Sequence, residues 1–199
     1  MNSFCEVIKD IYRLKVPFET VYTSVFLIKT PQGGLLVDSA TTDFDVDSYI
    51  VPALDELGIR EDELFGIVIT HNHSDHAGGL KRLTEVFPKL VAITKDTELF
   101  EEVEIYPLGG HTTDFLGVLD RRSGTLISGD GIQGAGIGRY RCMLQDKKMY
   151  RQTLDRIEED SNVQNLLFSH AYEPWYMDCI FGRDAVLECL DECKKYIGD

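Results

Sequence analysis

The sequence predicts an α/β fold in which mixed β-sheets are covered by helices. Strand-like runs alternate with amphipathic helical segments along the chain, and no low-complexity tract, repeat or Pro/Gly/Ser linker interrupts them. A length of 199 residues is enough for a continuous hydrophobic core in one compact domain. We therefore expect residues 1–199 to form a single domain.

The first part of the chain has an antiparallel β pattern followed by a helix. Runs rich in β-branched and aromatic residues predict strands over residues 7–15, 22–29 and 35–38. Apolar residues at helical spacing then predict a helix over residues 44–57, which Gly58 caps and Pro52 can kink.

A short buried strand over residues 65–69 and a helix over residues 80–87, which Pro88 ends, come next. The remaining predicted strands are residues 90–93, 103–108, 115–119, 125–128 and 166–169, and the remaining predicted helices are residues 147–159 and 183–196. Strands and helices in this order favour mixed sheets with helices packed on them.

Composition and charge exclude several classes of partner. The chain has 43% hydrophobic and 27% charged residues, and no apolar run approaches the roughly 18 residues of a membrane span. The N-terminus carries early charged residues and no secretory signal pattern, so we expect a cytoplasmic protein without a membrane partner. A net charge of −14 argues against binding to nucleic acid.

The five cysteines lack a CxxC pair and are expected to be reduced. Cys189 and Cys193 lie four residues apart in a predicted helix, a spacing at which two thiols can share a metal ion. We favour packing in the core for this pair, because cysteine behaves as a small apolar residue.

Residues 70–76, Thr-His-Asn-His-Ser-Asp-His, follow the predicted buried strand directly. His71 and His73 point to the same side of an extended chain, so both imidazoles can bind one ion. Asp75 and His76 come after the turn toward the next helix and can bind a second ion beside it. This density of ligands predicts a metal site.

The other two histidines strengthen this prediction. His111 and His170 each follow a strand-like run and lie in a turn flanked by glycine or serine. All five histidines of the chain thus lie in the cluster or at the ends of predicted strands. A surface loop that is rich in histidine by chance would not explain this distribution.

The pattern resembles the metallo-β-lactamase superfamily. Its signature HxHxDH stands here as His71, His73, Asp75 and His76. In family order the match continues with Asp38 after Leu35-Leu36-Val37, Gly110-His111-Thr112, Ser128-Gly129-Asp130 and Ser169-His170. The resemblance covers roughly residues 22–170 and implies a four-layered αβ/βα sandwich with two mixed β-sheets and the site at the edge between them.

The resemblance also implies a ligand set for two metal ions. It gives His71, His73 and His111 to one ion, Asp75, His76 and His170 to the other, and Asp130 to both, with Asp75 and Asp130 as the catalytic carboxylates. Asp38 would hold a ligand imidazole or its loop in place, with a purely structural turn contact as the alternative. Zinc is the expected metal, with iron or manganese as alternatives.

This ligand set indicates a binuclear metal-dependent hydrolase. A hydroxide that bridges the ions would attack a small ester, thioester, lactone or related acyl bond. The alternatives are a mononuclear iron sulfur dioxygenase and a phosphodiesterase that uses the same two-metal site. Hydrolysis of β-lactam antibiotics is not expected, because Cys142 lies too far beyond Asp130 to be the cysteine ligand of such enzymes.

The expected partner is a small-molecule substrate. Only 34 residues separate His76 from His111, so the substrate pocket is either simple or completed by a second copy in a homodimer. The glycine-rich segment 131–141 offers Arg139 and Tyr140 as substrate contacts, and the segment 16–22, similar to the family's substrate-covering flap, offers Phe18 and Tyr22. The alternative for segment 131–141 is a solvated surface loop, and the alternative for Phe18 and Tyr22 is packing in the core.

Overall fold

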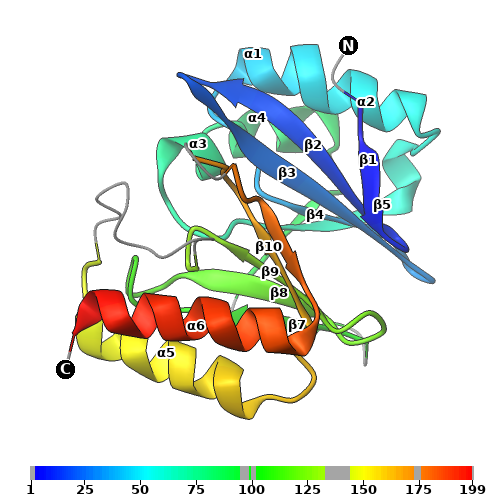
Figure 1. Cartoon of the computed structure of the whole chain (residues 1–199). Coiled ribbons are helices and arrows are strands. Elements are labelled where there is room, and N and C mark those ends of the chain that lie inside the picture. The colour runs from blue at the N-terminus through cyan, green and yellow to red at the C-terminus, as the bar shows by residue number, and fades with distance from the viewer. Residues whose placement is uncertain (1–2, 95–98, 100–101, 133–143, 173–175, 199) are drawn as a thin grey trace. The chain divides into compact units, whose positions relative to one another are not determined.

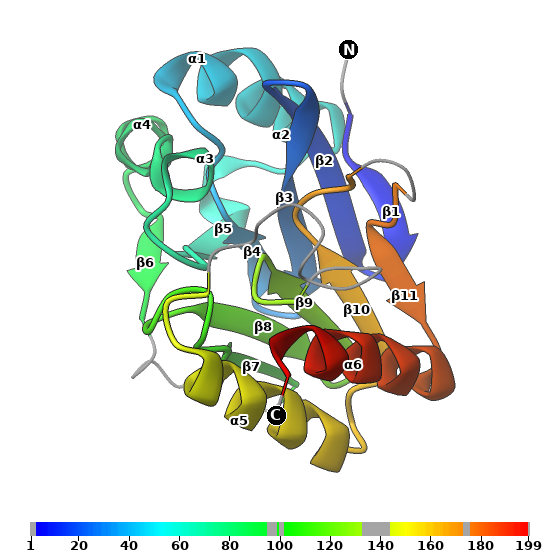
Figure 2. The same ribbon diagram turned by 60° about the vertical axis from the view of Figure 1, so that its left-hand side comes forward.

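A computed structural model describes residues 3–94, 99, 102–132, 144–172 and 176–198 (Figure 1). The chain contains two compact units, residues 1–94 and 95–199, and each has its own sheet (Figure 2). The sequence-based expectation of one domain over residues 1–199 stays a prediction.

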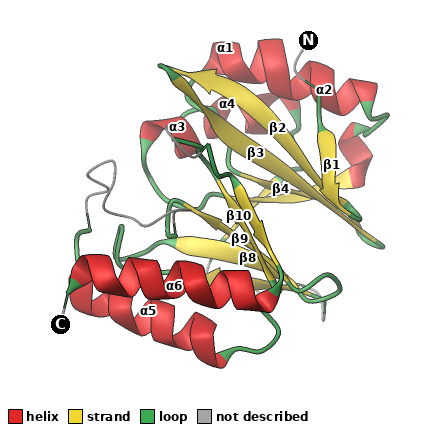
Figure 3. Ribbon diagram, in the orientation of Figure 1, coloured by secondary structure: helices red, strands yellow, loops and turns green. Residues whose placement is uncertain are grey.

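In its described residues the first unit forms a six-stranded mixed sheet (Figure 3). The strands are β1 (Cys5–Ile8), β2 (Ile11–Phe18), β3 (Val21–Thr30), β4 (Gly33–Val37), β5 (Leu64–Val68) and β6 (Val91–Ile93). They lie in chain order across the sheet, antiparallel from β1 to β4 and parallel from β4 to β6. Nearly all side chains of β4 and β5 are buried, which explains their continuous apolar sequence.

The segment predicted as one strand over residues 7–15 is two strands. β1 ends at Ile8 and β2 begins at Ile11, with Asp10 in the left-handed region at φ 65° between them. Aspartate tolerates this conformation better than most residues, so a tight turn forms here although no glycine marks it in the sequence.

The helix predicted over residues 44–57 has three parts, namely α1 (Asp43–Asp45), the π-helical segment η1 (Val46–Ile50) and α2 (Val51–Glu56). Thr42 caps its start, because the Thr42 side chain accepts a hydrogen bond from Asp45 N–H while the Asp45 carboxylate accepts from Thr42 N–H. The π-helical turn ends at Ile50, two residues before Pro52. Proline lacks an N–H and crowds the preceding turn, so the irregularity at this proline takes the form of a wider turn.

Three short helical segments complete the first unit. They are the 3₁₀ segment η2 (Glu61–Glu63) and the helices α3 (Ser74–Ala77) and α4 (Leu80–Val86). The helix α3 was not predicted as a separate element, because four residues are too few for a periodic apolar pattern.

Gly78 and Gly79 join α3 to α4 and pack against the backbone of the loop after β4. A Cβ atom at Gly78 would overlap the carbonyl oxygen of Thr41, and one at Gly79 the carbonyl oxygen of Ser39. Their φ angles, −64° and −86°, suit any residue, so close approach of the backbone is what requires glycine.

We therefore expect Gly79→Ala to lower the free energy of unfolding by about 1–3 kcal/mol, because the added methyl group forces the two segments apart. Urea denaturation measures this change. Lys81→Ala, on the exposed face of the next helix, is the control and should change stability by less than about 0.5 kcal/mol. Equal stability of the two variants would contradict the close packing.

The second unit forms a five-stranded mixed sheet in its described residues. Its elements are β7 (Val103–Pro107), β8 (Leu116–Asp120), β9 (Thr125–Gly129), α5 (Lys147–Glu159), β10 (Asn165–Phe168), β11 (Cys179–Phe181) and α6 (Arg183–Ile197). The strand order is β11-β10-β9-β8-β7, and only the β9–β10 pair is parallel. The three-residue strand β11 was not predicted, since it is too short to show alternation.

Helices α5 and α6 lie side by side on the second sheet (Figures 1 and 3). Their apolar faces bury Tyr150, Leu154 and Leu190 in one cluster with strand residues. Lys194 of α6 reaches Asp155 and Glu158 of α5 at 2.7 and 2.8 Å. Asp146 starts α5, because its side chain accepts a hydrogen bond from Met149 N–H.

Candidate metal centre

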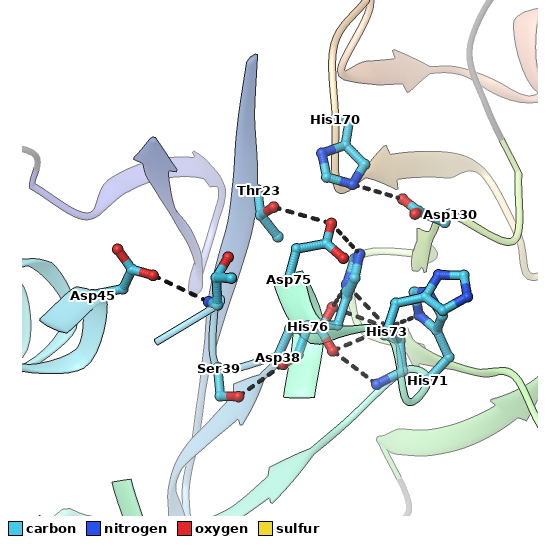
Figure 4. Close-up of polar contacts among 12 residues, drawn as sticks. Thr23, Asp38, Ser39, Asp45, His71, His73, Asp75, His76, Asp130 and His170 are labelled. Carbon is cyan, nitrogen blue, oxygen red and sulfur yellow. Dashed lines mark hydrogen bonds and ion pairs between the residues drawn. The ribbon is translucent and has the colours of Figure 1, made fainter. Parts of the chain in front are cut away.

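The first unit gathers its predicted ligands on the loop after β5 and on α3 (Figure 4). Nε2 of His71 lies 2.8 Å from Nδ1 of His73, and the two rings meet edge to face. Nε2 of His76 lies 3.3 Å from Oδ2 of Asp75. His71, Asp75 and His76 are buried, whereas His73 is exposed.

Asp38 lies at the end of β4, fully buried and with a left-handed φ of 65°. Its Oδ2 is 2.7 Å from Nδ1 of His76, and its Oδ1 accepts a hydrogen bond from Thr70 N–H at 2.8 Å. A carboxylate only accepts hydrogen bonds, so Nδ1 of His76 carries the proton and Nε2 keeps its lone pair. Asp38 therefore lies against the imidazole of His76, one of the predicted ligands, and its role toward a metal ion stays a prediction.

Ser39 and Thr23 also hold this loop, although the sequence analysis did not select them. The backbone N–H and the hydroxyl of Ser39 both donate to the carbonyl oxygen of His76 at 2.8 Å. The Thr23 hydroxyl, on β3, donates to Oδ2 of Asp75 at 3.4 Å. Thr23 and Ser24 are polar residues in the largely apolar strand β3, and this was the available signal for Thr23.

In the second unit, His111 lies on the connection between β7 and β8, which rests on α5. Gly110 has a φ of 135°, and a Cβ there would overlap Tyr150, so only glycine fits. Thr153 of α5 donates to the carbonyl oxygen of Gly109 at 2.8 Å. Backbone N–H groups of Gln145 and Asp146 donate to the carbonyl oxygens of His111 and Gly110. The start of α5 therefore fixes the backbone that carries His111.

Asp130 and His170 follow β9 and β10, the two parallel strands of the second sheet. Parallel strands bring their carboxyl ends to the same edge, and the two side chains accordingly meet there. Oδ1 of Asp130 lies 3.3 Å from Nε2 of His170, and both residues are buried (Figure 4).

The spacing of these donor atoms fits transition-metal ions. Two ligands bound at about 2.0–2.2 Å to a tetrahedral ion lie roughly 3.3 Å apart. The Asp75–His76 and Asp130–His170 pairs both have this spacing, and the His71–His73 pair is 2.8 Å apart. Imidazole nitrogen and carboxylate oxygen without sulfur suit zinc, iron and manganese.

Cysteine does not contribute to this donor set in the described residues. Cys5, Cys179, Cys189 and Cys193 are not in disulfide bonds there. A hydrogen bond with Cys193, together with burial, raises the pKa of the Cys189 thiol. A metal ligand must be the thiolate, so this shift supports the interpretation of the pair as core packing.

Two of the four predicted substrate-contacting residues, Phe18 and Tyr22, lie among the described residues. Phe18 ends β2 and Tyr22 lies in β3, both half-buried at a tight hairpin whose turn is Glu19-Thr20. Nζ of Lys15 lies 4.4 Å above the Tyr22 ring. Arg139 and Tyr140 lie outside the described residues. The substrate roles of these four residues stay predictions.

No helix among the described residues is long and apolar enough to cross a membrane.

Comparisons with known proteins agree with these features. The family described as the metallo-beta-lactamase superfamily matches residues 19–102. A solved structure of TMB-1 is similar with a TM-score of 0.77 at 17% identity, and the match covers 99% of each chain. The chain thus resembles the metallo-β-lactamase superfamily in sequence over residues 19–102 and in fold. The predicted fold class, with two mixed β-sheets flanked by helices, is confirmed.

Curated relatives of this chain include two kinds of protein. A beta-lactamase-like protein 2 homolog from Drosophila melanogaster is 29% identical over 67% of this chain and 54% of its own length. A hydroxyacylglutathione hydrolase from Legionella pneumophila (strain Corby) is 27% identical over 64% of this chain and 60% of its own length. The match thus spans less than two thirds of either relative.

Proposed function

We propose that this protein is a binuclear metal-dependent hydrolase of small molecules with an acyl bond. The observation that carries the proposal is the close approach of imidazole nitrogens and carboxylate oxygens, at 2.8–3.3 Å, within each of the two units. Such pairs of acceptors repel each other unless a cation or a proton lies between them.

The proposal assigns the ligands as the sequence predicted. His71, His73 and His111 would hold one ion, Asp75, His76 and His170 the other, and Asp130 both. Two divalent ions, zinc in the first place, would supply an activated water nucleophile and a Lewis acid for the carbonyl oxygen. With Asp75 and Asp130 as anionic ligands the site keeps a positive charge that favours an anionic or polarised acyl group.

The chain's own groups prepare this chemistry by fixing the ligands. Asp38 keeps the proton on Nδ1 of His76 and leaves Nε2 for the ion. Thr23 and Ser39 hold Asp75 and the backbone of His76 in place. Prearranged ligands of this kind lower the reorganisation needed for binding and reaction.

A thioester is the acyl bond that we place first. The support is the Legionella relative, which is a hydrolase of hydroxyacylglutathione. Esters and lactones react by the same attack on a carbonyl carbon and stay in the candidate class. Long nucleic acids are disfavoured because the net charge of −14 repels a polyanion even after two divalent ions bind.

We expect purified protein to carry about two transition-metal ions per chain and to hydrolyse a simple thioester or lactone. Elemental analysis of protein prepared without added metal measures the first quantity, and a panel of acyl substrates the second. Fewer than one ion after metal titration would contradict the binuclear site.

Two outcomes would replace the proposed reaction with an alternative. Selective cleavage of RNA at low salt without acyl turnover would indicate a phosphodiesterase, since low salt gives any nucleic-acid affinity its largest value. One iron per chain with oxygen uptake and no acyl turnover would indicate a sulfur dioxygenase.

A further inference from the structure

The Thr70 hydroxyl lies between Asp38 and two histidines of the proposed site. Thr70 is fully buried. Its Oγ1 lies 2.9 and 3.0 Å from the two carboxylate oxygens of Asp38, 3.1 Å from Nδ1 of His71 and 3.4 Å from Nδ1 of His76. One hydroxyl thus contacts a carboxylate and both rings.

The donor and acceptor roles follow from this geometry. A threonine hydroxyl has one hydrogen, and the Asp38 carboxylate can only accept, so the hydroxyl donates to Asp38. Its oxygen then accepts a hydrogen bond from Nδ1–H of His71. Nε2 of His71 keeps its lone pair, and this atom faces Nδ1 of His73 at 2.8 Å.

We propose that Thr70 is a positioning residue that holds His71 in the tautomer with Nε2 directed to the metal ion. The inference rests on the proposed two-ion site. The Asp38 carboxylate thus sets the tautomer of one proposed ligand of each ion. It contacts His76 directly and acts on His71 through the Thr70 hydroxyl.

The two routes differ in their dependence on the hydroxyl. His76 has its own short contact to Asp38 at 2.7 Å, and its contact to Thr70 is long at 3.4 Å. Nδ1 of His71 lies 3.1 Å from the Thr70 hydroxyl, which in turn donates to Asp38. Loss of the hydroxyl therefore weakens the ion at His71 and His73 and spares the ion at Asp75 and His76.

The test compares Thr70→Val with Thr70→Ser. Valine has the shape of threonine without the hydroxyl, whereas serine keeps the hydroxyl and loses only the methyl group. We expect Thr70→Val to weaken one of two ions by about 10–100-fold in a chelator competition, because ligand-orienting groups commonly contribute this much. Thr70→Ser should stay close to the parent protein.

A second readout is independent of activity and of affinity. Proton–nitrogen NMR spectra of the imidazole groups in zinc-loaded protein report which ring nitrogen carries hydrogen. We expect the His71 Nδ1–H signal of the parent to be lost or strongly shifted in Thr70→Val, while the His76 Nδ1–H signal stays. If valine prevents folding, Thr70→Ala takes its place in both measurements.

The outcomes separate this inference from the proposed function. A parent protein that binds no ion would overturn the proposed function and the inference together. A parent with two ions and a Thr70→Val variant with two equally tight ions and an unchanged His71 signal would overturn the inference alone. Equal weakening by serine and valine would do the same, because the methyl group and not the hydroxyl would then be responsible.

Discussion

Asp130→Ala is expected to lower kcat/KM for the best acyl substrate by at least about 100-fold and to reduce the metal content of the protein. Removal of a group that merely orients a ligand already lowers affinity or activity by about 10–100-fold, and Asp130 is proposed as a ligand of both ions. Its carboxylate lies 3.3 Å from Nε2 of His170, so the substitution also removes the carboxylate beside that imidazole. Steady-state kinetics and elemental analysis on the same sample measure both effects.

Two control variants test whether this effect is specific. Asp184, an exposed aspartate in the first turn of α6, should be replaceable by alanine without loss of metal. Cys189→Ala removes a buried thiol and should lower stability while metal and turnover stay. Metal loss in Cys189→Ala with metal retained in Asp130→Ala would reverse the proposed roles.

Asp38→Asn is expected to weaken metal binding by about 10–100-fold. Asparagine, like aspartate, tolerates the left-handed φ of 65°, so the backbone is preserved. The amide, however, offers one oxygen where the carboxylate offers two to His76 and Thr70. At least one of these buried donors then loses its acceptor. A chelator competition with zinc measures the change.

Asp38→Ala is the informative comparison for this position. Alanine removes both acceptors and also strains the left-handed backbone, so it should lower the melting temperature more than asparagine does. If Asp38→Asn binds metal as tightly as the wild-type protein, the carboxylate has only the structural role of supporting a turn.

The fold could be predicted from the sequence where patterns are long. The helices α5 and α6 and the central strands β4, β5 and β9 follow runs of apolar residues at regular spacing. Predictions failed for β11 and α3, which contain three and four residues, and for the turn at Asp10. Too few residues lie in such elements to show a period, and long-range pairing decides them.

The candidate ligands could be selected from the sequence because histidine is rare and its spacing is distinctive. Thr70, Thr23 and Ser39 carry no such signal, since threonine and serine are common in strands and turns alike. Their contacts join segments that lie far apart in the sequence, such as Thr70 with Asp38 and Thr23 with Asp75. Only the pairing of β3, β4 and β5 brings these groups together.

The backbone after β4 bears on how this protein can be engineered. Asp38 and Ala40 are both left-handed, with φ angles of 65° and 59°, and neither is glycine. An L-residue such as alanine costs about 1–2 kcal/mol in this conformation, a sizeable part of the roughly 5–15 kcal/mol that keeps a typical domain folded. Libraries that alter specificity near Asp38 therefore begin with little tolerance for destabilising substitutions. Stabilising changes on distant surfaces, introduced first, would widen the range of variants that still fold.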